Sequence, residues 1–165
     1  MKVFTDLLLE ELAVKATESP RARTHFNIHA SADDPVQRFI VVMNRQSYVR
    51  PHRHVAKSEL AVVMKGQFDV VTFDDAGKVT SRQVVGEGEQ AFAFELPLTT
   101  WHTLVARSDG STFLEIKAGP YDPATAAEFA PWAPPEGDAA VAGFIQWVRT
   151  AERGTSFPPG TFLVA

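Results

Sequence analysis

The sequence predicts an all-β protein, a sandwich or small barrel, with a helix near each end of the chain. Between residues 37 and 117, short runs rich in Val, Ile and Phe recur every eight to twelve residues and are separated by turn signals. Residues 4–16 and 139–151 instead repeat their apolar side chains at the helical period. A chain of 165 residues is expected to form a single domain, residues 1–165.

The N-terminal helix is predicted within residues 1–20. Thr5 or Asp6 can serve as its N-cap, and Pro20 ends it because the residue before a proline avoids the helical region. Residues 21–35 are polar, and we expect them to be irregular.

The β-barrel core is predicted over residues 21–118. Its tight turns are expected at Gly66 and Gly77, where glycine can take a positive φ. The predicted strands are residues 37–43, 60–64, 68–73, 79–85, 91–96, 102–107 and 112–117. Residues 119–165 form a C-terminal cover that begins with a Pro- and Ala-rich segment and contains the second helix.

The predicted strand at residues 60–64 is apolar on both faces. Ala61 and Val63 lie on the side of Glu59, and Leu60 and Met64 lie on the other. Such a strand must be covered on both sides, by the terminal helices, by a second subunit, or by both. A homodimer is therefore one of the open alternatives.

Composition excludes several classes of function. The net charge of −4 argues against a nucleic-acid or anionic-membrane partner. The absence of cysteine excludes disulfides, iron–sulfur ligation and thiol catalysis. Acidic residues interrupt the N-terminal apolar stretch, and apolar runs reach only about five residues, so neither a signal peptide nor a membrane span is predicted. We expect a cytoplasmic protein whose partner is a small molecule.

A metal site is predicted from four residues, His52, His54, Glu59 and His102. His52 and His54 are one residue apart and point the same way if they lie on a strand. Three imidazoles and a carboxylate suit a divalent transition metal such as Fe, Zn, Mn or Ni, whereas Ca and Mg prefer oxygen ligands. The alternatives are a histidine pair that binds nothing, and a three-histidine site from which Glu59 turns away.

The spacing of these residues resembles the two motifs of the cupin family, G-x5-H-x-H-x3,4-E-x6-G and G-x5-P-x-G-x2-H-x3-N. The first corresponds to residues 46–66 and the second to residues 91–106. Departures affect three glycines and the terminal asparagine of the motifs, and they fall at Gln46, Ala91, Thr99 and Ala106. All four ligand positions match. The resemblance implies a cupin-type small β-barrel or jelly roll that binds a metal.

Several segments are also similar to the WbuC-type cupin-fold metalloproteins, a bacterial group named for a gene of O-antigen biosynthesis clusters. They are residues 22–29, 34–38, 48–54, 101–105, 115–121 and 130–134. This resemblance implies a role in surface polysaccharide metabolism, but the group brings no firmly assigned reaction.

Five residues are candidates for binding the substrate. Asn27 and His29 could fold over the barrel mouth, Arg50 and Lys117 could bind an anionic group, and Tyr48 could be an acid or a pocket wall. The alternatives are hydrogen bonds to loop backbone for the first pair, solvation or pairing with carboxylates for the second, and packing for Tyr48. No catalytic residue is assigned.

Two functions fit these observations. The first is a metal-dependent enzyme, for example an isomerase or dioxygenase, that acts on a small anionic or carbohydrate-like substrate. The second is a non-catalytic, metal-dependent protein that binds or senses a sugar. The fold cannot decide between them, because one barrel hosts many functions.

Overall fold

The computed structural model describes residues 1–158. Residues 159–165, the end of the predicted C-terminal cover, lie outside the described residues. The elements in chain order are α1 (Asp6–Glu18), β1 (Arg23–Asn27), β2 (Val36–Met43), β3 (His52–Arg53), β4 (Glu59–Lys65), β5 (Gln67–Phe73), β6 (Val79–Gly86), β7 (Ala93–Leu96), β8 (Trp101–Ala106), β9 (Ser111–Ala118), β10 (Glu128–Phe129) and α2 (Val141–Val148).

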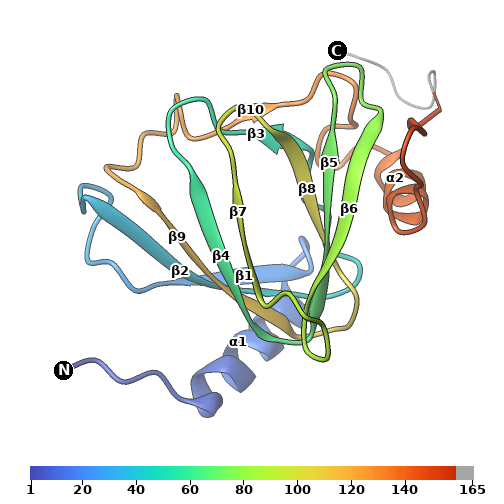
Figure 1. The fold of residues 1–165 in the computed structure, drawn as a ribbon. Coiled ribbons are helices and arrows are strands. Elements are labelled where there is room, and N and C mark those ends of the chain that lie inside the picture. Colours follow the sequence, from blue (N-terminus) through green and yellow to red (C-terminus); the bar gives the residue numbers. More distant parts are fainter. Residues whose placement is uncertain (159–165) are drawn as a thin grey trace.

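Two antiparallel sheets face each other (Figure 1). One has the strand order β1-β2-β9-β4-β7 and the other β10-β3-β8-β5-β6. Their inner faces enclose a core that includes Phe68, Phe113, Met43 and Leu104. The predicted all-β class, with a helix near each end, is confirmed.

The outer face of each sheet is covered by one end of the chain. Leu12 and Ala16 of α1 pack against Ile40 and Val42 of β2. On the opposite sheet, α2 and the segment before it bury residues such as Val71 of β5. The α2 helix lies beside this second sheet, and α1 lies under β1 and β2 (Figure 1). Both helices occur where the periodicity predicts them, because each has an apolar stripe to bury.

The expectation that residues 21–35 are irregular is wrong in part. Arg23–Asn27 forms the edge strand β1, which pairs with β2 from Arg23↔Met43 to Asn27↔Phe39. Its apolar Phe26 packs in the cluster under α1. Arg23, His25 and Asn27 line a cavity instead of the apolar core, so the segment lacks the apolar residues by which a strand is recognised.

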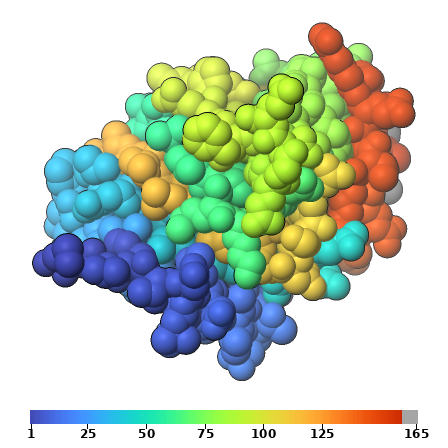
Figure 2. Space-filling view, turned by 60° about the horizontal axis from the view of Figure 1, so that its bottom comes forward, coloured from blue at the N-terminus to red at the C-terminus, as the bar shows by residue number. Residues whose placement is uncertain are grey.

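The outer face of β4 is only partly covered. Leu60 and Met64 are 38% and 46% exposed, although both are apolar. Figure 2 shows that the N-terminal segment crosses one side of this surface and leaves the green-coloured strand residues next to it open. The terminal helices were one of the covers expected for this strand, and they leave Leu60 and Met64 exposed.

Within residues 1–158, no helix is both long enough and apolar enough to cross a membrane.

Candidate metal centre

Three histidines meet on the inner face of the second sheet. His52 of β3 lies directly opposite His102 of β8, and His54 follows β3 immediately. The ring centroids are 4.3 Å apart for His52 and His102 and 5.0 Å apart for His52 and His54. Each ring offers a nitrogen that lies within 4.8 Å of the corresponding nitrogens of the other two. Strand pairing thus brings together residues that are fifty positions apart in the chain.

Backbone carbonyls fix the orientation of all three rings. Nδ1 lies 2.9 Å from the Arg50 oxygen in His52, 2.6 Å from the Ala126 oxygen in His54 and 2.9 Å from the Thr100 oxygen in His102. A carbonyl can only accept a hydrogen bond, so each Nδ1 carries the proton and donates it. Nε2 of His52 and of His102 is left with its lone pair, which is the arrangement found in histidines that bind metals. Nε2 of His54 instead faces the Glu59 carboxylate, which raises the pKa of this ring against the effect of burial.

Burial also favours the neutral rings that metal binding needs. Desolvation, helped by the neighbouring His102, lowers the pKa of His52 to about 3. Desolvation lowers the pKa of His102 as well. Both imidazoles are therefore neutral near pH 7, and neutral imidazole is the form that coordinates a metal.

Glu59 lies beside this group, next to His54. Its Oε2 is 2.9 Å from Nε2 of His54, and only 5% of its side chain is exposed. Nε2 of His54 is buried without a properly directed hydrogen bond to any described residue, despite this short distance. The compact group of three histidine nitrogens does not include Glu59. A carboxylate close to a buried, unsatisfied ring nitrogen suits a shared cation, so these residues fit a transition metal.

A lysine competes for the Glu59 carboxylate. Lys117 of β9 pairs with Glu59 of β4 in the sheet register, and its Nζ is 3.8 Å from Oε2 of Glu59. The same Nζ is 2.6 Å from Oε1 of Glu115. Burial raises the pKa of Glu59, but His54 and Lys117 outweigh it and lower that pKa. Burial lowers the pKa of Lys117, but Glu115 and Glu59 outweigh it and raise that pKa. The four side chains form one buried ionic network.

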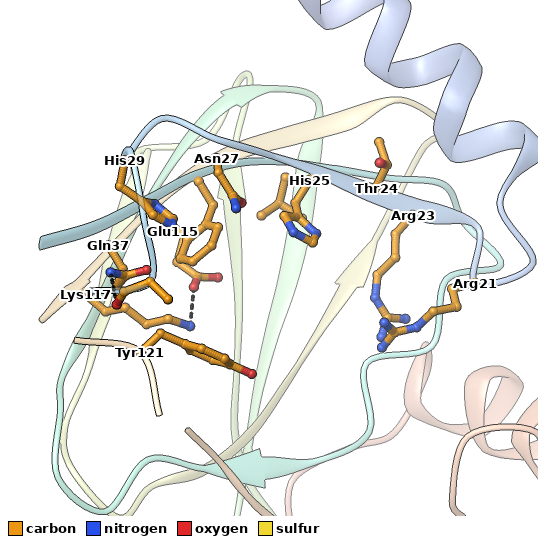
Figure 3. A pocket seen from close by; sticks show the side chains of 13 residues that line it. Arg21, Arg23, Thr24, His25, Asn27, His29, Gln37, Glu115, Lys117 and Tyr121 are labelled. Carbon is orange, nitrogen blue, oxygen red and sulfur yellow. Dashed lines mark hydrogen bonds and ion pairs between the residues drawn. The ribbon is translucent and has the colours of Figure 1, made fainter. Parts of the chain in front are cut away.

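A cavity of about 450 Å³ lies on the inner side of β1, β2 and β9 (Figure 3). Two cationic side chains stand at one end of it, and Lys117 with Glu115 stands at the other (Figure 3). Its lining residues are Arg21, Arg23, Thr24, His25, Asn27, His29, Ala32, Gln37, Phe39, Val41, Glu115, Lys117 and Tyr121.

The cavity adjoins the metal centre through a narrow pocket of about 20 Å³. That pocket is lined by His54 and also by Gln37, Lys117 and Tyr121, which line the large cavity as well. Lys117 therefore stands between the cavity and the histidines. This position allows it to contact both a bound molecule and the Glu59 carboxylate.

Three of the five predicted substrate residues line the large cavity, namely Asn27, His29 and Lys117. His29 is buried, and its Nδ1 lies 2.9 Å from the carbonyl oxygen and 3.0 Å from the amide nitrogen of Arg38. The backbone thus holds its ring, as the alternative interpretation of this residue expected. Lys117 is paired with carboxylates, which was also one of the alternatives.

The other two predicted substrate residues lie elsewhere. Tyr48 is buried in the core beside Phe144, and its hydroxyl donates a 2.7 Å hydrogen bond to the Pro134 oxygen. Arg50 donates to the Ala130 oxygen at 2.9 Å. Neither lines the large cavity, and the contacts of Tyr48 are those of a packing residue.

Sequence reasoning missed other residues of the cavity wall. Arg21, Arg23 and His25 are the clearest cases, and they belong to the segment expected to be irregular. Polar residues at every second position from Arg23 to Asn27 could have indicated an edge strand with a polar inner face.

Comparison with known proteins supports the fold. Oxalate oxidase in complex with glycolate aligns with a TM-score of 0.51 and 20% identity over 70% of this chain and 59% of its own. KdgF from Halomonas sp. aligns with a TM-score of 0.49 and 20% identity, covering 63% of this chain and 84% of its own. A sugar phosphate isomerase of the cupin superfamily from Silicibacter pomeroyi aligns with a TM-score of 0.46 and 18% identity over 59% of each chain.

The last two scores are below 0.5, so the fold assignment rests on the oxalate oxidase match and the two facing sheets. The chain has the cupin-type jelly-roll fold. A family model described as a domain of unknown function (DUF6016) matches residues 4–85, just under half of the chain. A search of curated proteins found no match.

Proposed function

We propose that this protein is a metal-dependent enzyme that acts on a small anionic or carbohydrate-like substrate. The observation that supports this most directly is the set of three histidines, each held by a backbone carbonyl through Nδ1, whose ligand nitrogens lie within 4.8 Å of one another. His52, His54 and His102 would hold a divalent Fe, Zn, Mn or Ni ion, with Glu59 beside them. When bound, such an ion would supply Lewis acidity or a centre for O₂ chemistry.

The cavity provides the groups that would bind and orient the substrate. Its volume of about 450 Å³ suits a small molecule. Arg21 and Arg23 share the single carboxylate of Glu136, at 2.7 and 2.6 Å, so this end of the wall keeps an unbalanced positive charge. Lys117 is paired with Glu115 at 2.6 Å, and Asn27 adds an uncharged hydrogen-bonding group. Guanidinium and ammonium groups form charge-assisted bonds with carboxylate or phosphate oxygens, so an anionic substrate is favoured.

Glu115 and Lys117 would control charge at the inner end of the cavity. Burial, with the nearby charge of Glu59, raises the pKa of Glu115. A buried carboxyl with a raised pKa takes up a proton more readily than an exposed one. Lys117 holds this carboxyl at 2.6 Å, so the pair could position a substrate and exchange a proton with it.

The finer parts of the proposal rest on sequence resemblance. We place the protein with the WbuC-type cupins, in the cytoplasm of a bacterium, and its substrate among the intermediates of surface polysaccharide metabolism. Segments along the whole chain support this placement, including residues 48–54 next to the histidines and 115–121 beside the cavity.

The test is metal content followed by turnover. The protein, purified without a histidine tag, should contain close to one equivalent of a transition metal, and His52→Ala should lose most of it. His25→Ala is the matched control, because His25 lines the cavity but is not one of the three converging histidines. Unchanged metal in His52→Ala would contradict the site. Metal binding with sugar-induced spectral shifts but no product would favour the alternative, a sugar-binding or sensing protein.

A further inference from the structure

A second set of cavities lies on the outer face of the β10-β3-β8-β5-β6 sheet, beyond the end of α2. One has a volume of about 550 Å³ and the other about 350 Å³. They share the lining residues Asp69, Arg107, Arg149 and Thr150, and we call the two together the basic groove. Val105 of β8 lines this groove, whereas His102 of the same strand faces the metal centre from the opposite side of the sheet. The groove is therefore separate from the metal centre.

The basic groove has a surplus of positive charge. Five arginines line it, against two carboxylates, Asp69 and Glu152: these arginines are Arg45, Arg82, Arg107, Arg149 and Arg153. Buried Asp69 pairs with Arg82 at 2.9 Å and with Arg107 at 3.9 Å. Among the described residues, Arg45, Arg149 and Arg153 form no ion pair. This concentration is notable in a chain whose net charge is −4.

Two of the arginines are held in place by backbone carbonyls. Arg82 donates from Nε to the Ala151 oxygen at 3.2 Å and from Nη2 to the Val148 oxygen, so it also fixes the end of α2. Arg149 donates from Nη2 to the Arg45 oxygen. Side chains that are already ordered lose less entropy when they bind a ligand. The groove is thus a preorganised cationic surface with a more exposed rim, which includes Arg107 with a side chain 44% exposed.

We propose that the basic groove binds a small molecule that carries phosphate groups. Guanidinium groups match phosphate oxygens in pairs and remain charged at any physiological pH. Arg45, Arg149 and Arg153 form no ion pair among the described residues, and Glu152 is the lining carboxylate left to offset their charge. The remaining positive charge favours a ligand with two or more negative charges. This inference does not depend on the proposed reaction, because the groove shares no lining residue with the histidine site.

The experiment titrates inorganic pyrophosphate into the metal-free protein by calorimetry and maps it by backbone amide NMR shifts. Wild type should bind it, with shifts concentrated at residues 105–107 and 149–153. Arg107→Gln should weaken binding roughly tenfold, the loss expected for one charge-assisted hydrogen bond. Arg153→Gln provides a second, exposed position, should Arg107→Gln fail to fold.

Two controls separate the groove from the first cavity. Arg21→Gln removes a partly exposed, ion-paired arginine that lines only the other cavities, and it should leave pyrophosphate affinity unchanged. His52→Ala, which tests the metal site, should leave it unchanged too. The inference is wrong if Arg107→Gln and Arg153→Gln both bind like wild type, or if Arg21→Gln abolishes binding. It is also wrong if wild type does not bind pyrophosphate; a change in the sedimentation coefficient of Arg107→Glu would then indicate that the groove joins copies of the chain.

Discussion

The buried ring of His52 should make the metal-free protein sensitive to mild acid. Desolvation, helped by His102, lowers the pKa of this ring to about 3, whereas an unfolded chain has a histidine pKa of about 6.5. Between these two pKa values the His52 ring is protonated in the unfolded state and neutral in the folded state. The free energy of unfolding therefore rises with pH across this window, and it is lost as the pH falls from about 6.5 towards 3.

The size of the effect follows from the linkage relation. One proton of difference gives a slope of at most about 1.4 kcal/mol per pH unit, so His52 alone should account for a loss of about 2.5 kcal/mol between pH 6 and pH 4. The lowered pKa of His102 acts in the same direction. Glu59 has a lowered pKa and adds its own loss below about pH 4.5, the ordinary value for this group. The net pKa of His54 is raised, so this ring is protonated in both states well below pH 6.5.

The cleanest window is therefore pH 6 to pH 5, measured by urea unfolding in the presence of a chelator. His52→Gln should reduce the slope of the unfolding free energy against pH by about 1 kcal/mol per unit, at an unchanged m-value. A control titration of His25→Gln should leave most of the slope, because that ring is much less buried than His52. Equal slopes in wild type and His52→Gln would refute the idea that burial keeps this ring neutral.

Three further predictions concern the site, the core and the open face of β4. Glu59→Gln should weaken transition-metal binding about 10- to 100-fold without abolishing it, because three histidines remain; complete loss of metal in a titration would make Glu59 indispensable, and no loss would place it outside the site. Phe68→Ala removes a fully buried ring from the centre of the core and should lower the free energy of unfolding by about 3–5 kcal/mol in chemical denaturation; a cost below about 1 kcal/mol would contradict its central position. If a second subunit covers the exposed apolar residues of β4, wild type should sediment as a dimer and Leu60→Glu as a monomer of unchanged circular dichroism; a wild-type monomer would rule this cover out.

The fold was predictable where the apolar pattern is strong. The strands from β4 to β9 combine β-branched and aromatic residues with clear glycine turns, and each occurs within a few residues of its expected position. The edge strand β1 was missed because it contains few apolar residues, and its inner face lines a cavity instead of the apolar core. Hydrophobic periodicity indicates burial against apolar atoms, so it does not detect a strand whose inner face lines a polar cavity.

The histidine cluster was predictable for a different reason. Spacing brings His52 and His54 to one side of a strand and predicts that His102 joins them from a distant strand, and the match to the cupin motifs supports this set. The carbonyls that hold these rings belong to Arg50, Thr100 and Ala126, and their oxygens carry no residue-type signal in the sequence. The orientation of the rings thus depends on backbone geometry that only the folded structure provides.

The role of Glu59 shows most clearly what spacing cannot decide. Its position on β4 directs its side chain inward, as predicted, yet the charge it faces comes from Lys117, fifty-eight residues later on β9. The carboxylate lies 2.9 Å from Nε2 of His54 and 3.8 Å from Nζ of Lys117, and Lys117 is itself held closer by Glu115 at 2.6 Å. Because Glu115 takes the nearer contact with the lysine, the Glu59 carboxylate keeps its charge available on the side of His54. A substitution such as Lys117→Met should therefore leave metal binding by the three histidines intact, and it should act mainly on what the cavity binds.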